Sequence, residues 1–234
     1  MTTNTPVRHT PTDLVQRKIL VVVATLVLVI ALASIWRRLQ PATHKIDRAP
    51  IIGAAAGIGE ALARETLDAV HHQGRLIIVT DHDPVGVDVP RDYRWEAFQA
   101  ELKQQKGVTI AGSEVVEFDP DEPMVSGCSS AALKQILNRH ADVAAIVFLI
   151  DLPEWARVAG ALPQNITAKI IAVDNQGISL RSHYSGYFSS GLLTALIARR
   201  SPLSDLPSDP KTPREWFDKY YQVYNRQNSE TLSD

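Results

Sequence analysis

The longest apolar stretch of the chain runs from Ile19 to Trp36 and contains no charged residue. Its eighteen residues would span about 27 Å as an α-helix, which is close to the hydrocarbon thickness of a membrane. Basic pairs occupy positions 17–18 and 37–38, from which long cationic side chains can reach lipid head groups. This pattern predicts a single-pass transmembrane helix over residues 19–36.

The same stretch has a second interpretation as a cleaved secretory signal. The sequence Ala31-Leu32-Ala33 fits the small-residue cleavage site of such signals. The apolar run continues beyond this site to a second basic pair, which favours an uncleaved anchor. Basic residues are nearly balanced on the two sides of the span, so the charge count does not fix the orientation. The signal-like run places the following domain on the extracytoplasmic (periplasmic) side.

The flanking segments are polar. Residues 1–18 show no hydrophobic period, which predicts a disordered tail. Residues 37–50 carry two prolines among mixed charges and are interpreted as a linker.

Residues 51–201 alternate between short apolar runs and segments with helical periodicity. We predict strands at 75–80, 108–118, 143–150, 169–173 and 192–198, and helices at 51–72, 94–105, about 129–140 and 153–161. Strands separated by helices form parallel sheets through right-handed crossovers. The expected fold is therefore α/β: a doubly wound, mostly parallel five-stranded sheet of the Rossmann-like type.

Residues 202–234 form a C-terminal tail with one defined element. The sequence from Thr212 to Glu215 is a capping box with proline at the first helical position, which predicts a docked helix over residues 213–224. Five aromatic residues share one stripe of this helix: Trp216, Phe217, Tyr220, Tyr221 and Tyr224. The stripe either docks on the core of the domain or forms a partner-binding surface.

Composition excludes several classes of function. The formal net charge is -2 and the pI is about 6.4, so no nucleic acid is expected as a partner. Cys128 is the single cysteine, which excludes an intramolecular disulfide and a cysteine-based metal site. The histidines at 71, 72 and 82 do not have the spacing of helical metal ligands. We expect neither a metal nor a cofactor.

A glycine motif near the start of the domain suggests an alternative. Gly53, Gly57 and Gly59 in GAAAGIGEALARE resemble the cofactor loop of the short-chain dehydrogenase/reductase family, a resemblance that implies NAD(P) binding by these glycines. Only Ala49 to Ile52 lie between Arg48, the last charged residue of the linker, and Gly53, whereas the family's loop follows a buried strand. The family's Tyr-x-x-x-Lys pair is missing here. An amphipathic helix, whose glycines allow close packing on a neighbouring element, is the preferred interpretation.

Polar residues follow the predicted strands at the edge where doubly wound folds bind ligands. They are Thr80, Asp81, His82 and Asp83, then Asp151, then Asp174 and Asn175, and finally Arg199 and Arg200. LIIVTDHDP and FLIDLPEW resemble a response-regulator receiver domain, which would make Asp151 a phosphoacceptor beside Mg²⁺. That family has a lysine where this chain has arginine. Strand-end aspartates also commonly cap the following turn.

A broader resemblance covers residues 74–200. GRLIIVTDHDP, WEAFQAELKQQKGVTIAGSEVV, SSAALKQILNRHADVAAIVFLIDLP and KIIAVDN resemble one lobe of a type I periplasmic-binding protein. The resemblance implies an extracytoplasmic binding domain in a membrane-anchored bacterial protein. Two lobes closing on a ligand would need about twice this length, so capture of a small molecule within one chain is not implied.

Together these patterns favour a non-enzymatic binding or assembly subunit, an accessory protein of a membrane or envelope complex with a protein partner. The alternatives are an NAD(P)-dependent short-chain-reductase-like enzyme or its inactive relative, and a receiver-like phospho-switch.

Overall fold

The computed structural model describes residues 49–81, 89–116, 127–163, 166–175, 180–200 and 210–232. The predicted tail, the membrane span at 19–36 and nearly all of the predicted linker lie outside these ranges. Within the described ranges, no helix has both the length and the apolar character needed to cross a membrane.

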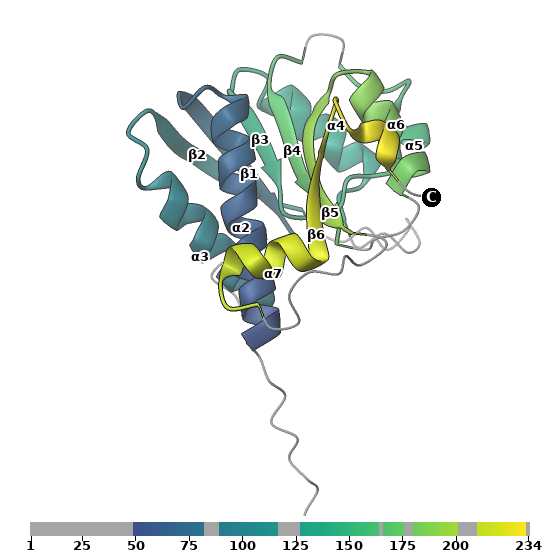
Figure 1. Ribbon diagram of the computed structural model, residues 1–234. Coiled ribbons are helices and arrows are strands. Elements are labelled where there is room, and N and C mark those ends of the chain that lie inside the picture. The colour runs from purple at the N-terminus through teal and green to yellow at the C-terminus, as the bar shows by residue number, and fades with distance from the viewer. Residues whose placement is uncertain are drawn as a thin grey trace, which may run out of the picture. The chain divides into compact units, whose positions relative to one another are not determined.

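Helices and strands alternate along most of the described chain (Figure 1). The helices are α2 (Ala49–Ala69), α3 (Val89–Leu102), α4 (Ser130–Arg139), α5 (Trp155–Val158), α6 (Leu180–Ser189) and α7 (Pro213–Tyr220), with a 3₁₀ turn at Ser229–Thr231. The strands are β1 (Gly74–Thr80), β2 (Val108–Val115), β3 (Ala145–Phe148), β4 (Lys169–Val173), β5 (Leu193–Arg199) and β6 (Tyr221–Asn225). The α/β domain begins two residues before the predicted boundary, because α2 starts at Ala49.

The strands form one six-stranded sheet in the order β2-β1-β3-β4-β5-β6. The first five pair in parallel, and β6 pairs antiparallel with β5. The predicted α/β fold with a mostly parallel sheet is confirmed. The predicted number of strands is wrong, because the C-terminal tail contributes a sixth.

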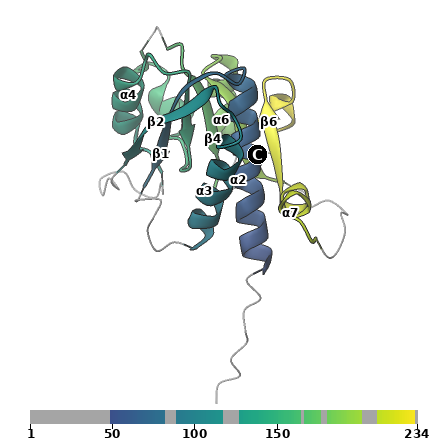
Figure 2. The same ribbon diagram turned by 90° about the vertical axis from the view of Figure 1, so that its left-hand side faces the viewer.

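Helices cover both faces of the sheet, and each face has its own hydrophobic core (Figure 2). On one face, Leu133 of α4 and Tyr184 of α6 pack with Val79 and Phe148. On the other face, Leu62 of α2, Phe98 of α3 and Phe217 of α7 pack with alternate residues of the same strands. Because successive strand residues point to opposite faces, a strand that is apolar at every position, such as β3, can serve both cores.

The glycines of α2 lie inside the helix, where they let two other helices approach closely. A β-carbon on Gly53 would collide with the Trp216 ring, and one on Gly57 would collide with the Pro213 backbone oxygen of α7. A β-carbon on Gly59 would lie 2.9 Å from the Ala97 β-carbon of α3. The glycines therefore have a packing role, as the helical interpretation of the motif expects.

The C-terminal tail differs from its prediction. The helix predicted over residues 213–224 ends at Tyr220, and the next five residues form β6. The sequence YQVYN alternates across the sheet: Tyr221 and Val223 pack on the α2 face, and Tyr224 is buried on the α6 face. Pairing with β6 also gives hydrogen-bond partners to backbone N–H and C=O groups on the edge of β5, which would otherwise be unpaired. These gains of tertiary packing outweigh the helical period of the aromatic residues.

Candidate functional site

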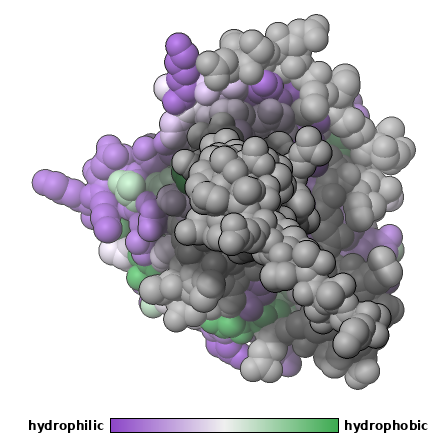
Figure 3. Space-filling model, turned by 90° about the horizontal axis from the view of Figure 1, so that it is seen from below, coloured by the Kyte–Doolittle hydropathy of each residue, from purple (hydrophilic) through white to green (hydrophobic). Residues whose placement is uncertain are grey.

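The carboxyl ends of the parallel strands gather polar residues, as the sequence predicts. Asp151 follows β3, Asp174 and Asn175 follow β4, and Arg199 ends β5. α2 begins at the same edge, because its first turn lies beside Asn175 and Arg199 in one cavity. Figure 3 shows this end of the molecule, where the coloured atoms present small hydrophobic areas between hydrophilic ones.

Three charged side chains at this edge are almost completely buried. The exposed fractions are 2% for Asp151, 4% for Asp174 and 4% for Arg94 of α3. Asn175 connects them: its backbone N–H donates to Asp151 Oδ1 at 2.6 Å, and its side-chain oxygen accepts from Arg94 Nη1 at 2.9 Å. Its amide nitrogen also donates to the Leu149 carbonyl at 3.3 Å. Asn175 thereby joins the end of β3, the end of β4 and helix α3.

A buried tyrosine completes this polar cluster. The Tyr184 hydroxyl of α6 donates to Asp174 Oδ1 at 3.4 Å. Burial, reinforced by the nearby carboxylates of Asp174 and Asp151, raises the pKa of Tyr184 well above its usual value. The phenol therefore stays protonated and remains a hydrogen-bond donor at physiological pH. We call Arg94, Asp151, Asp174, Asn175 and Tyr184 the polar cluster.

The polar cluster includes Asp151, the residue that the receiver-like sequence FLIDLPEW would make a phosphoacceptor. A phosphoacceptor must be reached by a phosphodonor and by Mg²⁺ from solvent. Asp151 is 2% exposed, and one of its oxygens accepts a hydrogen bond from the chain's own backbone. Its position favours a structural role at the turn after β3.

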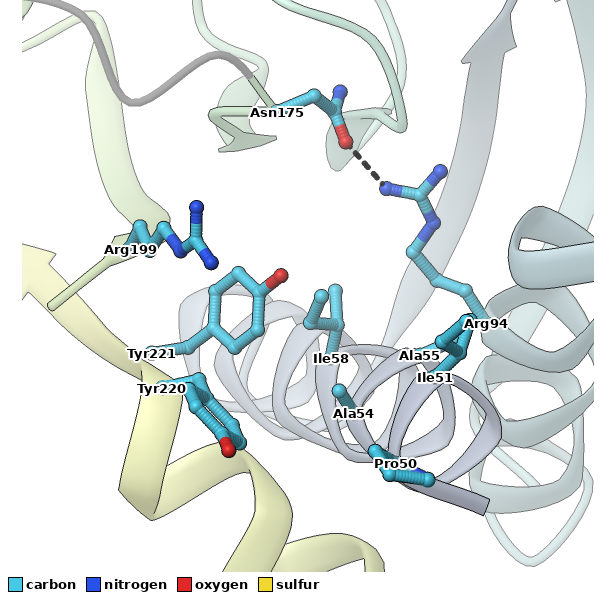
Figure 4. A pocket seen from close by; sticks show the side chains of 10 residues that line it. All are labelled: Pro50, Ile51, Ala54, Ala55, Ile58, Arg94, Asn175, Arg199, Tyr220 and Tyr221. Carbon is cyan, nitrogen blue, oxygen red and sulfur yellow. Dashed lines mark hydrogen bonds between the residues drawn. The ribbon is translucent and has the colours of Figure 1, made fainter. Parts of the chain in front are cut away.

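A cavity of about 390 Å³ opens beside the polar cluster on the α2 face of the sheet (Figure 4). We call it the edge cavity. One wall is apolar and comes from α2: Pro50, Ile51, Ala54, Ala55 and Ile58. The rest of the lining carries the Arg94 and Arg199 guanidinium groups, Asn175, Tyr220 and Tyr221. Its volume lies within the range of small-molecule sites in proteins.

The polar groups of the edge cavity are arranged around its mouth. Figure 4 shows the Arg199 guanidinium next to the Tyr221 ring, across the cavity from the hydrogen-bonded pair of Arg94 and Asn175. No aspartate or glutamate is among its described lining residues. The charged groups among these described residues are therefore cationic.

The structure separates the aromatic residues of the predicted stripe. Phe217 and Tyr224 are 5% and 1% exposed and belong to the hydrophobic cores. Trp216 is half-buried against α2, and Tyr220 and Tyr221 are half-buried at the edge cavity. Phe217 and Tyr224 are therefore core residues, whereas Trp216, Tyr220 and Tyr221 keep part of their surface accessible to solvent.

Among the residues that the structure describes, no three histidine, cysteine or carboxylate side chains are grouped as metal ligands. Gly53, Gly57 and Gly59 are not among the lining residues of the edge cavity, and atoms of α3 and α7 lie directly against them.

Comparison with known proteins identifies the fold. The sequence matches no protein-family model and no curated protein. A solute-binding protein of an ABC transporter from Burkholderia graminis, in complex with D-arabinose, is 15% identical, with a TM-score of 0.51 over 76% of this chain and 62% of that one. A sugar-binding protein of a sugar ABC transporter from Bacillus halodurans is 12% identical, with a TM-score of 0.50 over 76% of this chain and 64% of that one.

A third similar structure, an arabinose-binding protein from Geobacillus stearothermophilus, is 15% identical with a TM-score of 0.49, over 77% of this chain and 63% of that one. The chain thus spans a little under two thirds of the length of each of these proteins. The expected resemblance to a periplasmic-binding-protein lobe is confirmed at the level of the fold.

Proposed function

We propose that this protein is a membrane-anchored, non-enzymatic binding subunit whose α/β domain works on the extracytoplasmic side together with a protein partner. The observation that carries the proposal is the edge cavity, which opens at the carboxyl ends of the strands in a fold shared with solved sugar-binding proteins. The uncharged stretch at 19–36 supplies the anchor.

The arrangement of the carboxyl edge supports binding rather than catalysis. The two buried carboxylates and Tyr184 are engaged in hydrogen bonds within the fold, which fixes the ends of β3 and β4. A preorganised polar edge of this kind suits recognition, because little conformational entropy is lost when a ligand or partner arrives.

A partner is proposed because the described residues build one sheet and therefore one wall of a cleft. The structurally similar sugar-binding proteins are longer than this chain. A second chain can supply the facing wall, and Tyr220 and Tyr221 are placed at the rim of the edge cavity to contact it. Half-buried tyrosines are common anchors in protein interfaces.

The test is purification of the full-length protein from its native membranes in mild detergent, followed by native mass spectrometry. We expect a second protein in fixed stoichiometry, and replacement of Tyr220 and Tyr221 by serine should lower its recovery. Ser182→Ala, on the exposed side of α6, is the control. A solitary chain that recovers no partner under these conditions contradicts the proposal.

A further inference from the structure

The two arginines of the edge cavity differ in their surroundings. Arg94 is buried and donates to Asn175, so its orientation is fixed within the polar cluster. Arg199 is exposed at the end of β5, and among the described residues no carboxylate forms an ion pair with it. One guanidinium is thus structural, and the other is available at the cavity mouth.

Tyr221 is fixed beside the available arginine by the sheet itself. Arg199 of β5 and Tyr221 of β6 are direct partners in the antiparallel register. Tyr221 is the first residue of β6, and its ring stacks on Phe217 with centroids 6.2 Å apart. A guanidinium and a phenol hydroxyl held side by side present several hydrogen-bond donors to the same region.

The α2 side of the edge cavity, as far as the structure describes it, carries no polar side chain. Ala54, Ala55 and Ile58 of α2 form a flat apolar surface, because two of the three side chains end at the β-carbon. The ring of Tyr220 borders the same space. A thin apolar body fits between such a surface and a tyrosine ring, and burying it is favourable.

From these features we infer that the edge cavity binds a small organic carboxylate with a flat apolar body, with Arg199 and Tyr221 holding the carboxylate and α2 covering the apolar part. A guanidinium pairs bidentately with a carboxylate through two parallel N–H···O bonds. One available cation matches one negative charge. This site shares Tyr220 and Tyr221 with the partner contact proposed above, so the variants that test it leave both tyrosines unchanged.

The probe is benzoate, added at millimolar concentration to the full-length protein in detergent and followed by saturation-transfer NMR and isothermal titration calorimetry. Benzamide has the same shape without the charge and is the matched ligand control. We expect benzoate to bind at least tenfold more tightly than benzamide, because the neutral amide leaves the Arg199 charge uncompensated.

Two variants locate the site. Arg199→Gln should weaken benzoate binding about tenfold or more, whereas Arg157→Gln, an exposed arginine of α5 paired with Glu154, should leave it unchanged. Ala54→Leu should block the apolar part of the cavity and abolish binding, with the far-ultraviolet circular dichroism spectrum preserved.

Three results would overturn the inference: no benzoate binding at millimolar concentration, equal binding of benzoate and benzamide, or undiminished binding in Arg199→Gln. Native mass spectrometry measures the assembly with the protein partner in a separate experiment. Loss of benzoate binding with an intact assembly therefore refutes the carboxylate site alone, and loss of the assembly with intact benzoate binding refutes the proposed function alone.

Discussion

At Gly57, a single missing β-carbon determines how closely α7 approaches α2. The space that a side chain would need is occupied by the Pro213 backbone oxygen and, at 2.8 Å, by the Phe217 β-carbon. The same three glycines that resemble a nucleotide loop are therefore explained by helix packing. Sequence alone could not distinguish these roles, because both require glycine for a close backbone approach.

Substitution of Gly57 tests this role. Gly57→Ala should lower the free energy of unfolding by about 1–3 kcal/mol, because α7 must shift away from α2. Urea denaturation followed by tryptophan fluorescence measures the change. Gly160→Ala is the control, because a β-carbon there meets no atom within 4 Å, and it should be neutral or slightly stabilising. Equal stability of both variants and the unmodified protein would refute the packing role.

Glu114, on the edge strand β2, makes the stability of the fold depend on pH. Burial alone would raise its pKa, but hydrogen bonds from His140 at 2.7 Å and Arg139 at 2.6 Å outweigh burial and hold the pKa below its usual value. A carboxylate with a lowered folded-state pKa stabilises the fold fully above the unfolded-state pKa of about 4.3. This stabilisation is lost as the pH falls through the folded-state pKa.

The matching experiment compares Glu114→Gln with the unmodified protein in urea between about pH 6 and pH 3. The variant should be less stable at pH 6 and should lose less of its stability on acidification, so the two curves converge at low pH. Parallel curves over the whole range would show that Glu114 contributes nothing to the acid sensitivity.

Some residues of the candidate site could be predicted, and others could not. Asn175 and Arg199 follow apolar strands, so the parallel topology alone places them at the carboxyl edge. Arg94 lies on a helix and reaches the edge only because α3 packs beside α2, which no local pattern encodes. The apolar wall of the edge cavity could not be predicted for the same reason, because it depends on where α2, a helix that precedes the sheet, packs in the fold.

At the scale of elements, the α7–β6 unit shows how local and tertiary preferences compete. The capping box at Thr212 was predicted correctly: its hydroxyl accepts from Glu215 N–H at 3.2 Å, and the Glu215 carboxylate accepts from Thr212 N–H at 3.4 Å. The start of a helix is encoded by such short-range contacts. Its end at Tyr220 depends on the edge of β5, which is distant in sequence.

Removal of the cap should loosen α7 locally. Thr212→Ala should cost about 1 kcal/mol of helix stability, or roughly a fivefold loss of amide protection over α7. Hydrogen exchange with mass spectrometry on the full-length protein measures the amide protection of α7 at the level of single peptides. Thr109→Ala, an exposed threonine on the opposite edge of the sheet, should leave α7 protection unchanged. Unaltered exchange of α7 in Thr212→Ala would refute the contribution of the cap.

Helix α6 was missed altogether by sequence reasoning. Its buried residues Tyr184, Tyr187 and Phe188 follow a helical spacing, but polar and glycine residues between them weaken the period. Gly186 lets the Trp155 ring of α5 pack against α6, and the Tyr187 hydroxyl donates to the Pro153 carbonyl at 2.7 Å. The helix is thus stabilised by tertiary contacts that a pattern of apolar residues does not reveal.

At the scale of the whole molecule, the alternation of apolar runs and helical segments was sufficient to predict the doubly wound sheet. Five parallel strands in this order leave few topologies open, since crossovers are right-handed. The number of strands was not predictable, because β6 comes from the tail and adds to the sheet without a crossover helix.

The side of the membrane is testable with a cysteine reporter. Cys128 is 1% exposed, so the unmodified chain should react little with a membrane-impermeant maleimide. Lys103→Cys places a thiol on the exposed surface after α3. We expect labelling of this variant in intact spheroplasts, as for an extracytoplasmic domain. Labelling that appears only after lysis would place the domain in the cytoplasm.

The position of the α2 N-terminus has a consequence for the edge cavity. Pro50 and Ile51 line the edge cavity, so the first turn of the domain's first helix forms part of the cavity wall. A substitution in the first turn of α2 therefore alters the lining of the cavity and the start of the domain at the same time.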